Sequence, residues 1–269
     1  MKGGPQRVFL LPCIFGDEPS LANLRSMLAD RIAFELLDYP DIDRPSREIR
    51  DFDHIVRRTV ERITTSQPSG DVQIAGYSFG GLVGFAAAHQ LRAEGRRVGL
   101  LAIMDSRALS LKMPHSVQLT RNRDAAPAAW GAAGDIVSRV LIAAGLSEIV
   151  RAAIGPVGRI FGTGASNGLR RLFLQNLRGR ALGRLTLGRL DIPLILFRAR
   201  DQGFPDLPAD LGWSVHCSAV RCVTLDGDHN SMFRSEHLPA NAQRISSEMT
   251  ASSRPTESRG ASRLSSNNY

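Results

Sequence analysis

The sequence has few of the residues that build disulfide scaffolds, metal sites or membrane spans. Its 269 residues include only three cysteines, at positions 13, 217 and 222, in a spacing typical of neither a disulfide framework nor a zinc site. No run of about 18 uncharged apolar residues occurs, and no N-terminal stretch has the pattern of a secretory signal. We therefore expect reduced thiols, no bound metal, no membrane span and a soluble, cytoplasmic protein.

Lysine is also scarce. Only two of the 34 basic residues are lysine, and the formal net charge is +8. Residues 107–200 hold fifteen basic and four acidic residues, a net charge of +11. This segment has neither the interleaved aromatic residues nor the motif of a nucleic-acid-binding module. We expect no nucleic-acid partner, and the arginines are either solvated or attract an acidic partner.

Short apolar runs recur along the chain and are separated by helical or loop-like stretches. They predict strands at residues 8–11, 32–39, 72–75, 98–104, 192–197 and 220–225. Residues 52–63 have apolar positions at helical spacing. Strands that alternate with helices indicate an α/β domain whose mostly parallel sheet is covered by helices on both faces. We place this single domain at residues 1–250.

The strand pattern stops between residues 108 and 190. Helical patches at 136–144, 148–154 and 169–177 are separated by glycines there. We predict a helical lid insertion in which glycines 155, 158, 162, 164 and 168 act as hinge-like links, with a helical subdomain that has no gating role as the alternative. Residues 251–269 are rich in Ser, Arg, Thr and Asn and predict a disordered C-terminal tail.

The pentapeptide Gly76-Tyr77-Ser78-Phe79-Gly80 carries the strongest functional signal. It lies between an expected strand and the small-residue stretch 81–88, which is the context of the G-x-S-x-G nucleophile elbow. Glycines on both sides of the serine remove Cβ atoms that would collide in such a strained turn. The motif predicts a serine hydrolase of the α/β-hydrolase fold, and a glycine-rich turn without chemistry is the alternative.

A serine hydroxyl becomes a good nucleophile only when a base removes its proton and an acid holds that base in the right tautomer. Among the six histidines, His229 follows the last expected strand, and α/β enzymes collect catalytic groups at the carboxyl ends of their strands. We predict His229 as the general base for Ser78.

Two aspartates are serious candidates for the acid. Asp105 closes the strand that follows the elbow helix, next to the strand that carries the serine. Asp201 closes the next expected strand and is the alternative. Asp226 and Asp228 are weaker candidates, because neighbours of the base in sequence seldom point back at it.

An oxyanion hole needs two backbone N–H donors. We expect the first from Phe79, directly after the nucleophile, and the second from Cys13, or less favourably Ile14, after the first strand. Cys13 as a second nucleophile is a minor alternative.

With these residues placed, the chain resembles the thioesterase domains that end nonribosomal peptide and polyketide assembly lines. The resemblance runs from about Arg7 to Met249. It rests on three stretches: Gly76-Tyr77-Ser78-Phe79-Gly80-Gly81, Met104-Asp105-Ser106 and Gly227-Asp228-His229-Asn230-Ser231-Met232. In that family the acid often follows the strand after the elbow helix, as Asp105 does. General α/β-hydrolases and stand-alone editing thioesterases usually carry it one strand later, where Asp201 lies.

The first loop departs from the family pattern. Family members often carry His-Pro-Ala-Gly-Gly there, whereas this chain reads Leu11-Pro12-Cys13-Ile14-Phe15-Gly16. The departure bears on the oxyanion donor assigned to Cys13.

The resemblance implies a serine thioesterase without a cofactor of its own. Its substrate would be an acyl, peptidyl or polyketide thioester on the phosphopantetheine arm of an acyl or peptidyl carrier protein, or on coenzyme A. An acyl-Ser78 intermediate would be released by water or by a nucleophile within the acyl chain. The rival readings are a carboxylesterase or lipase-like hydrolase of oxygen esters and a non-catalytic binding protein with the same fold.

Overall fold

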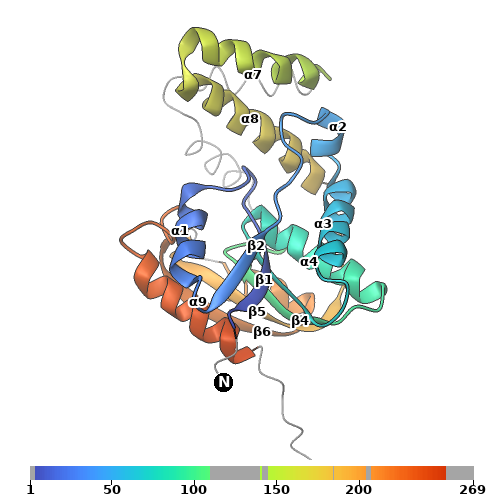
Figure 1. The fold of residues 1–269 in the computed structure, drawn as a ribbon, viewed down its shortest axis with the longest axis vertical. Coiled ribbons are helices and arrows are strands. Elements are labelled where there is room, and N and C mark those ends of the chain that lie inside the picture. The colour runs from blue at the N-terminus through green and yellow to red at the C-terminus, as the bar shows by residue number, and fades with distance from the viewer. Residues whose placement is uncertain (1–3, 110–139, 141–144, 184, 204–206, 253–269) are drawn as a thin grey trace, which may run out of the picture.

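The computed structural model describes residues 4–109, 140, 145–183, 185–203 and 207–252. Figure 1 shows the arrangement of their helices and strands. In chain order these are β1 (Gln6–Leu11), α1 (Pro19–Leu28), β2 (Ile32–Leu36), α2 (Ser46–Ile49), α3 (Phe52–Ser66), β3 (Val72–Tyr77), α4 (Phe79–Ala93), β4 (Val98–Met104), α7 (Ser147–Phe161), α8 (Thr163–Leu182), β5 (Leu190–Asp201), the 3₁₀ turn η1 (Trp213–Val215), β6 (Cys217–Asp228) and α9 (Leu238–Ser252).

The strands form a six-stranded sheet in the order β2-β1-β3-β4-β5-β6, and every neighbouring pair is parallel. The direction of progression reverses between β1 and β3, because the chain first adds β2 on one side of β1 and then returns to its other side. In open α/β sheets the carboxyl ends of strands at such a switch point border the ligand-binding crevice. The topology therefore places the ends of β1 and β3 at the expected position of a site.

Both faces of the sheet are covered by helices, as the sequence predicts. In β1, Val8 and Leu10 belong to the core shared with α1 and α9, while Phe9 and Leu11 belong to the core shared with α3 and α4. All four side chains have 0 % relative exposure. A strand buried on both faces reads as a continuous apolar run, which explains why these strands are visible in the sequence.

Every expected strand is present, but only β4 has both of the predicted ends, and β2, β5 and β6 differ most. β2 ends at Leu36, whereas β5 and β6 each extend over 12 residues and are longer than their apolar runs. β6 is an edge strand with many exposed positions. Backbone pairing with β5 continues where the side chains are polar, so an apolar run marks only the buried part of such a strand.

The insertion contains a helical hairpin made of α7 and α8, which pack against each other. Gly162, with a φ of +86°, links the two helices. The other four glycines expected to be hinges lie inside α7 or α8, so that expectation is wrong for them. Glycine lowers helix propensity by only about 1 kcal/mol, which helix packing readily overrides. A Cβ atom on Gly158 would lie 2.9 Å from Ser166 Oγ, so the glycine allows close contact between the helices.

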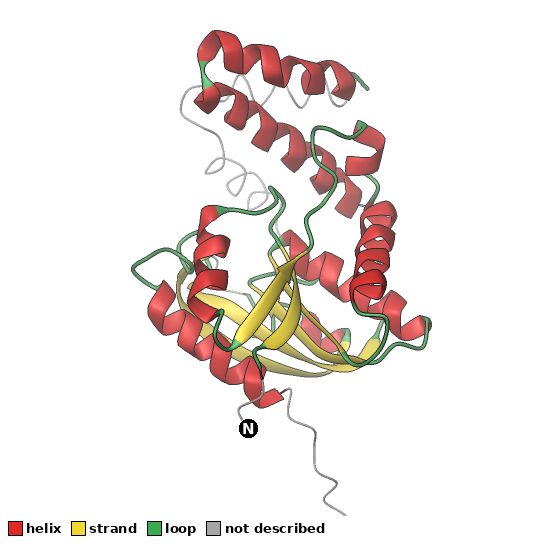
Figure 2. Ribbon diagram, viewed as in Figure 1, coloured by secondary structure: helices red, strands yellow, loops and turns green. Residues whose placement is uncertain are grey.

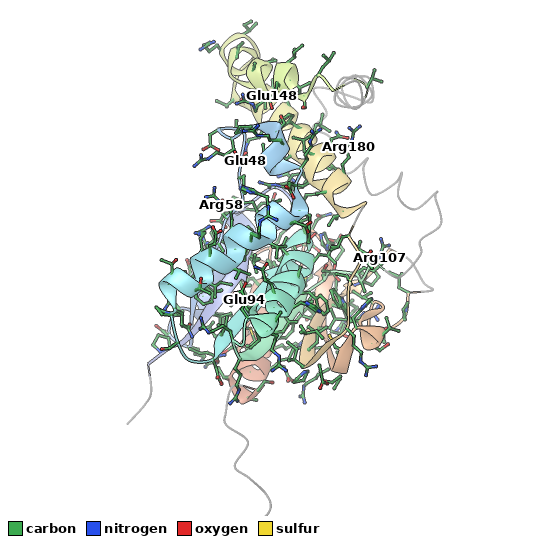
Figure 3. The ribbon with its side chains drawn as sticks, turned by 90° about the vertical axis from the view of Figure 1, so that its right-hand side faces the viewer. Glu48, Arg58, Glu94, Arg107, Glu148 and Arg180 are labelled. Atoms are coloured by element: carbon green, nitrogen blue, oxygen red, sulfur yellow. The ribbon has the colours of Figure 1, made fainter. Side chains whose placement is uncertain are left out.

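The hairpin has its own apolar core. Its buried members are Ile49 of α2 together with Val150, Ile154, Leu169, Phe173, Leu174 and Leu177. Figure 2 shows the hairpin beyond the carboxyl edge of the sheet, and Figure 3 shows Glu48 of α2 near Glu148 of α7. The Ser46 N–H of α2 donates a 2.7 Å hydrogen bond to Glu148 Oε1. The hairpin is therefore joined to the main domain through α2.

Two expectations fall mostly outside the described residues. The helical patch at 136–144 is described only at Val140, and most of the tail, 253–269, is not described. α9 continues to Ser252 and so includes the first two residues of the predicted tail. Among the described residues, no helix has the length and apolar character that a membrane crossing requires.

Replacement of Phe173 by Ala tests the hairpin core. Phe173 is fully buried, whereas Ile149 of α7 is 59 % exposed. We expect Phe173→Ala to lower the free energy of unfolding by about 3–5 kcal/mol through the cavity it leaves. Ile149→Ala, the matched control, should change it by less than about 0.5 kcal/mol. Urea unfolding followed by circular dichroism measures both, and equal losses would show that the hairpin has no packed core.

Candidate active site

The turn between β3 and α4 holds Ser78 in an unusual backbone conformation. Its φ of +56° and ψ of −117° are strained for a residue with a Cβ atom. Two backbone hydrogen bonds hold the turn: the Ser78 N–H donates to Met104 O at 2.9 Å, and the Gly81 N–H donates to Ser78 O at 3.0 Å. Strain at this point exposes the serine hydroxyl above the sheet.

The glycines of the motif are required by close contacts. A Cβ atom on Gly76 would lie 2.1 Å from Gly80 O, and one on Gly80 would lie 2.2 Å from Leu11 O. Neither distance is possible for real atoms. The first turn of α4 therefore lies directly against the ends of β3 and β1, and any larger residue would push them apart.

The structure brings Ser78, His229 and Asp105 together in one hydrogen-bonded row. His229 Nε2 lies 3.0 Å from Ser78 Oγ, and His229 Nδ1 lies 2.6 Å from Asp105 Oδ2. The three residues follow the carboxyl ends of β3, β6 and β4. A carboxylate can only accept, so Nδ1 carries the proton and Nε2 is left to accept the serine hydroxyl.

Asp105 is buried but remains ionised. Burial alone would raise the pKa of its carboxyl, but the hydrogen bond and charge of His229 and two further donors hold this pKa below its usual value. The donors are the Ala199 N–H at 2.9 Å and Gln202 Nε2 at 2.7 Å, both to Oδ1. An ionised carboxylate in this position orients the imidazole and stabilises its charged form.

The other candidate acids lie elsewhere. Asp201 is exposed at the end of β5. Asp226 forms ion pairs with Arg200 and Arg244. Asp228 accepts hydrogen bonds from the backbone N–H groups of the turn that follows it. The structure thus places Asp105, and not the alternatives, against His229.

Two side chains at the site were missed by the sequence analysis. Tyr77 stacks on the His229 ring, with centroids 5.1 Å apart, and its hydroxyl donates to His229 O. Gln202 bridges Asp105 and the Ala199 carbonyl. The aromatic residue directly before Ser78 was a visible signal for Tyr77. Nothing in the sequence indicates Gln202, because its role depends on where β5 ends relative to β4.

Buried Asn241 of α9 fixes the loop that carries the histidine. Its side chain accepts from the Asp226 N–H at 2.9 Å and donates to Asp226 O and Met232 O. These bonds span both sides of His229, so α9 helps to determine where the imidazole lies.

The two expected oxyanion donors lie at the same edge of the sheet. Phe79 is the first residue of α4, where backbone N–H groups have no partner within the helix. Leu11 of β1 pairs in register with Gly76 of β3. Cys13 and Ser78 each lie two residues after this pair in the sequence. The Cys13 thiol is buried, and burial together with the Glu18 charge raises its pKa to about 12. A protonated, buried thiol is a poor nucleophile, which disfavours the second-nucleophile alternative.

Several arginines of the basic middle segment have partners within the chain. Arg170 pairs with Asp41, and Arg171 pairs with Glu18 and lies over the Phe15 ring. The expectation of solvated arginines is therefore wrong for these residues. They attach α8 to the loops that follow β1 and β2.

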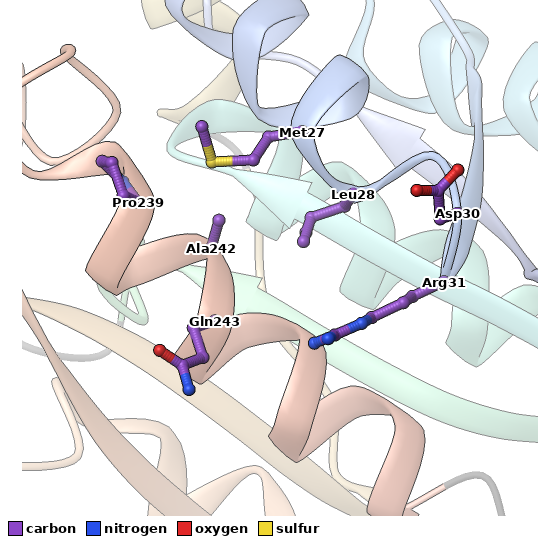
Figure 4. A pocket seen from close by; sticks show the side chains of 7 residues that line it. All are labelled: Met27, Leu28, Asp30, Arg31, Pro239, Ala242 and Gln243. Carbon is purple, nitrogen blue, oxygen red and sulfur yellow. The ribbon is translucent and has the colours of Figure 1, made fainter.

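A surface pocket between α1 and α9 lies apart from this site. Figure 4 shows the residues that line it, Met27, Leu28, Asp30, Arg31, Pro239, Ala242 and Gln243. It borders the end of α1, where the chain enters β2 at the amino edge of the sheet. No group of His, Cys, Asp and Glu within the described residues could hold a metal ion.

Replacement of Gly80 by Ala tests the close contact at the elbow. The new Cβ would collide with the backbone oxygens of Leu11 and Pro12, so we expect a loss of about 3 kcal/mol in the free energy of unfolding. Gly179→Ala is the matched control, because nothing lies within 4 Å of its Cβ position in α8. It should stabilise the protein by about 0.5–1 kcal/mol. A Gly80→Ala variant as stable as the wild type in urea unfolding would contradict the contact.

Several solved structures share the fold of this chain. The NocB thioesterase domain, solved as a covalent complex with a fluorophosphonate nocardicin G analog, has a TM-score of 0.65 and 20% identity over 91% of this chain and 93% of that chain. The RedJ thioesterase of the prodiginine pathway in Streptomyces coelicolor has a TM-score of 0.62 and 20% identity, over 91% and 87%. AB3403, a four-domain nonribosomal peptide synthetase, matches with a TM-score of 0.66 and 21% identity over 90% of this chain but 19% of its own length.

None of the curated proteins matches the sequence significantly. The model of the thioesterase domain family matches residues 6–249, which is nearly the span on which the sequence resemblance rests. The chain therefore belongs to the thioesterase domain family and is a hydrolytic enzyme.

Proposed function

We propose that this enzyme cleaves an acyl thioester through a covalent acyl-Ser78 intermediate. The observation that carries the proposal is the hydrogen-bonded row of Ser78, His229 and Asp105 at the carboxyl edge of the sheet. In a member of the thioesterase domain family, this geometry suits nucleophilic catalysis by serine.

Acylation follows from the protonation states of the row. His229 Nε2 accepts the Ser78 proton as Oγ attacks the thioester carbonyl, and an Oγ–C bond forms. The C–S bond then breaks, and the imidazolium donates the proton to the leaving thiolate. The Asp105 carboxylate stabilises the imidazolium throughout, while the N–H groups of Phe79 and Cys13 stabilise the oxyanion.

Deacylation repeats these steps with a second nucleophile. His229 removes a proton from water, whose oxygen attacks the acyl carbon. The Oγ–C bond then breaks as the imidazolium returns the proton to Ser78 Oγ, and a carboxylic acid is released. An amine or hydroxyl group within the acyl chain can replace water and release a lactam or lactone. The α7–α8 hairpin, acting as a lid that excludes water, would select between these outcomes.

The proposed substrate is an acyl, peptidyl or polyketide chain on the phosphopantetheine arm of a carrier protein. Three observations support this substrate class: the thioesterase family match, the fold shared with domains such as NocB and RedJ, and the match to one part of a nonribosomal peptide synthetase. A carrier protein would approach the carboxyl edge of the sheet, where Ser78 lies. The enzyme would need no cofactor of its own, since the thioester is already activated.

The acid is tested by comparing Asp105→Asn with Asp201→Asn. Asp105→Asn removes the charge that orients His229, so we expect kcat to fall by about 10⁴-fold with the fold retained. Asp201→Asn changes an exposed carboxylate and should leave kcat within about twofold of the wild type. Steady-state kinetics measure both variants. The triad is wrong if Asp201→Asn abolishes turnover while Asp105→Asn does not.

The bond specificity is tested with matched substrates. We expect kcat/KM for an acyl N-acetylcysteamine or acyl-phosphopantetheine thioester to exceed that for the corresponding oxoester. A fluorophosphonate probe should add to Ser78 in the wild type and not in Ser78→Ala, as mass spectrometry would show. A clear preference for the oxoester would identify an esterase, and a wild type without adduct would identify a non-catalytic protein.

A further inference from the structure

The Asp105 carboxylate is held from the ends of two neighbouring strands. Its Oδ2 lies 2.6 Å from His229 Nδ1, whereas its Oδ1 accepts from Gln202 Nε2 at 2.7 Å and from the Ala199 N–H at 2.9 Å. His229 follows β6, and Gln202 follows β5. Each oxygen of the carboxylate therefore faces groups from a different strand.

The register of β5 and β6 brings Gln202 and His229 side by side. The last registered pair of these strands is Asp201 with Asp228. Gln202 and His229 come directly after this pair in the sequence. Both residues therefore leave the sheet at the same point, next to the strand end that carries Asp105.

A bulge in β6 produces this register. Between the pair formed by Ala199 and Leu225 and the last pair, β6 contains one residue more than β5. Bulges re-aim the side chains that follow them and are common next to active sites. Without the extra residue, Gln202 would lie opposite Asp228 instead of His229.

The Gln202 amide suits this position because it donates twice. Its Nε2 donates to Asp105 Oδ1 and to the Ala199 carbonyl, each at 2.7 Å. An amide nitrogen carries two protons, so both are used, and the reverse orientation would place the amide oxygen against two acceptors. The bond to Ala199 ties the amide to the end of β5 and thereby fixes the direction of the bond to Asp105.

The backbone of Asp105 makes this support important. Its φ of +46° is uncommon for a residue with a Cβ atom. Its N–H donates to Phe197 O at 2.6 Å, so β5 binds Asp105 through the backbone as well as through the side chain. A strained residue keeps its conformation only where several contacts determine it.

We propose that Gln202 is a positioning residue for the catalytic acid, which fixes the Asp105 carboxylate with Oδ2 toward His229 and satisfies Oδ1 with a neutral donor. This inference rests on the proposed acyl-Ser78 mechanism. It makes the end of β5 part of the support of the triad, although none of the three triad residues lies on that strand.

The burial of Asp105 explains why a donor to Oδ1 affects catalysis. Asp105 is 6 % exposed. Burial alone would raise the pKa of its carboxyl, and the bonds from His229, Ala199 and Gln202 lower this pKa. The carboxylate stabilises the imidazolium that forms in the transition state. Loss of its orientation should therefore affect the transition state more than the ground state.

Replacement of Gln202 by Leu tests the positioning role. Gln202→Leu removes both hydrogen bonds and keeps a side chain of similar size. We expect kcat for an acyl N-acetylcysteamine thioester to fall by about 10-fold with KM nearly unchanged, a small part of the loss of about 10⁴-fold for the carboxylate itself. Gln67→Leu is the matched control, because its half-buried amide donates to Asp71 O at the amino edge of the sheet. It should leave kcat unchanged.

The pH profile separates positioning from simple stabilisation of the fold. Gln202→Lys keeps a donor near Asp105 but adds a positive charge, which disfavours the imidazolium form of His229. Because His229 acts as a base only when neutral, the acid limb of kcat/KM should move to lower pH by about one unit. Gln67→Lys makes the same change of charge far from the site and should leave the acid limb in place.

The outcomes distinguish this inference from the proposed function. If the wild type neither cleaves the thioester nor reacts with a fluorophosphonate at Ser78, the mechanism fails and the inference fails with it. If the wild type is active, a wild-type kcat in folded Gln202→Leu or an unmoved acid limb in Gln202→Lys overturns the inference alone. Gln202→Lys carries the test if circular dichroism shows that Gln202→Leu does not fold.

Discussion

The close contact between the first turn of α4 and the ends of β1 and β3 is the constraint on which the site depends. It explains why Gly76 and Gly80 lack side chains, since a Cβ atom on either would overlap backbone atoms. It also forces Ser78 into a positive φ, which directs the hydroxyl away from the sheet. The strain is held by the buried strands on either side, so the site is rigid because the core beneath it is well packed.

The hydrogen-bonded row of Ser78, His229 and Asp105 is assembled from strand ends that are far apart in sequence. Asp105, also at a positive φ, receives hydrogen bonds from the end of β5, while Asn241 of α9 holds both sides of the His229 loop. Each residue of the row therefore has a neighbour that fixes its position. The arginines of α8 fix the loops on the other side of Ser78 by pairing with Asp41 and Glu18. Part of the basic charge of residues 107–200 therefore attaches the α7–α8 hairpin to these loops.

Much of the fold could be predicted because β1, β3 and β4 are buried on both faces and appear as continuous apolar runs. The ends of β5 and β6 could not be predicted, because backbone pairing continues there between residues with polar, exposed side chains. The glycines at 155, 158, 164 and 168 resembled hinges, yet they lie within helices. Local propensity is a weak signal wherever two helices pack together.

By itself, the sequence predicted Ser78 as the nucleophile and His229 as the general base, since the elbow motif and a histidine after the last strand reflect local backbone requirements. It left Asp105 and Asp201 as alternatives, because both close strands at the same edge. Only the tertiary structure separates their positions, because it places Asp105 Oδ2 2.6 Å from His229 Nδ1 and leaves Asp201 exposed. The position of Gln202 was likewise visible only in the structure. Its role depends on contacts between segments distant in the chain, which no local pattern records.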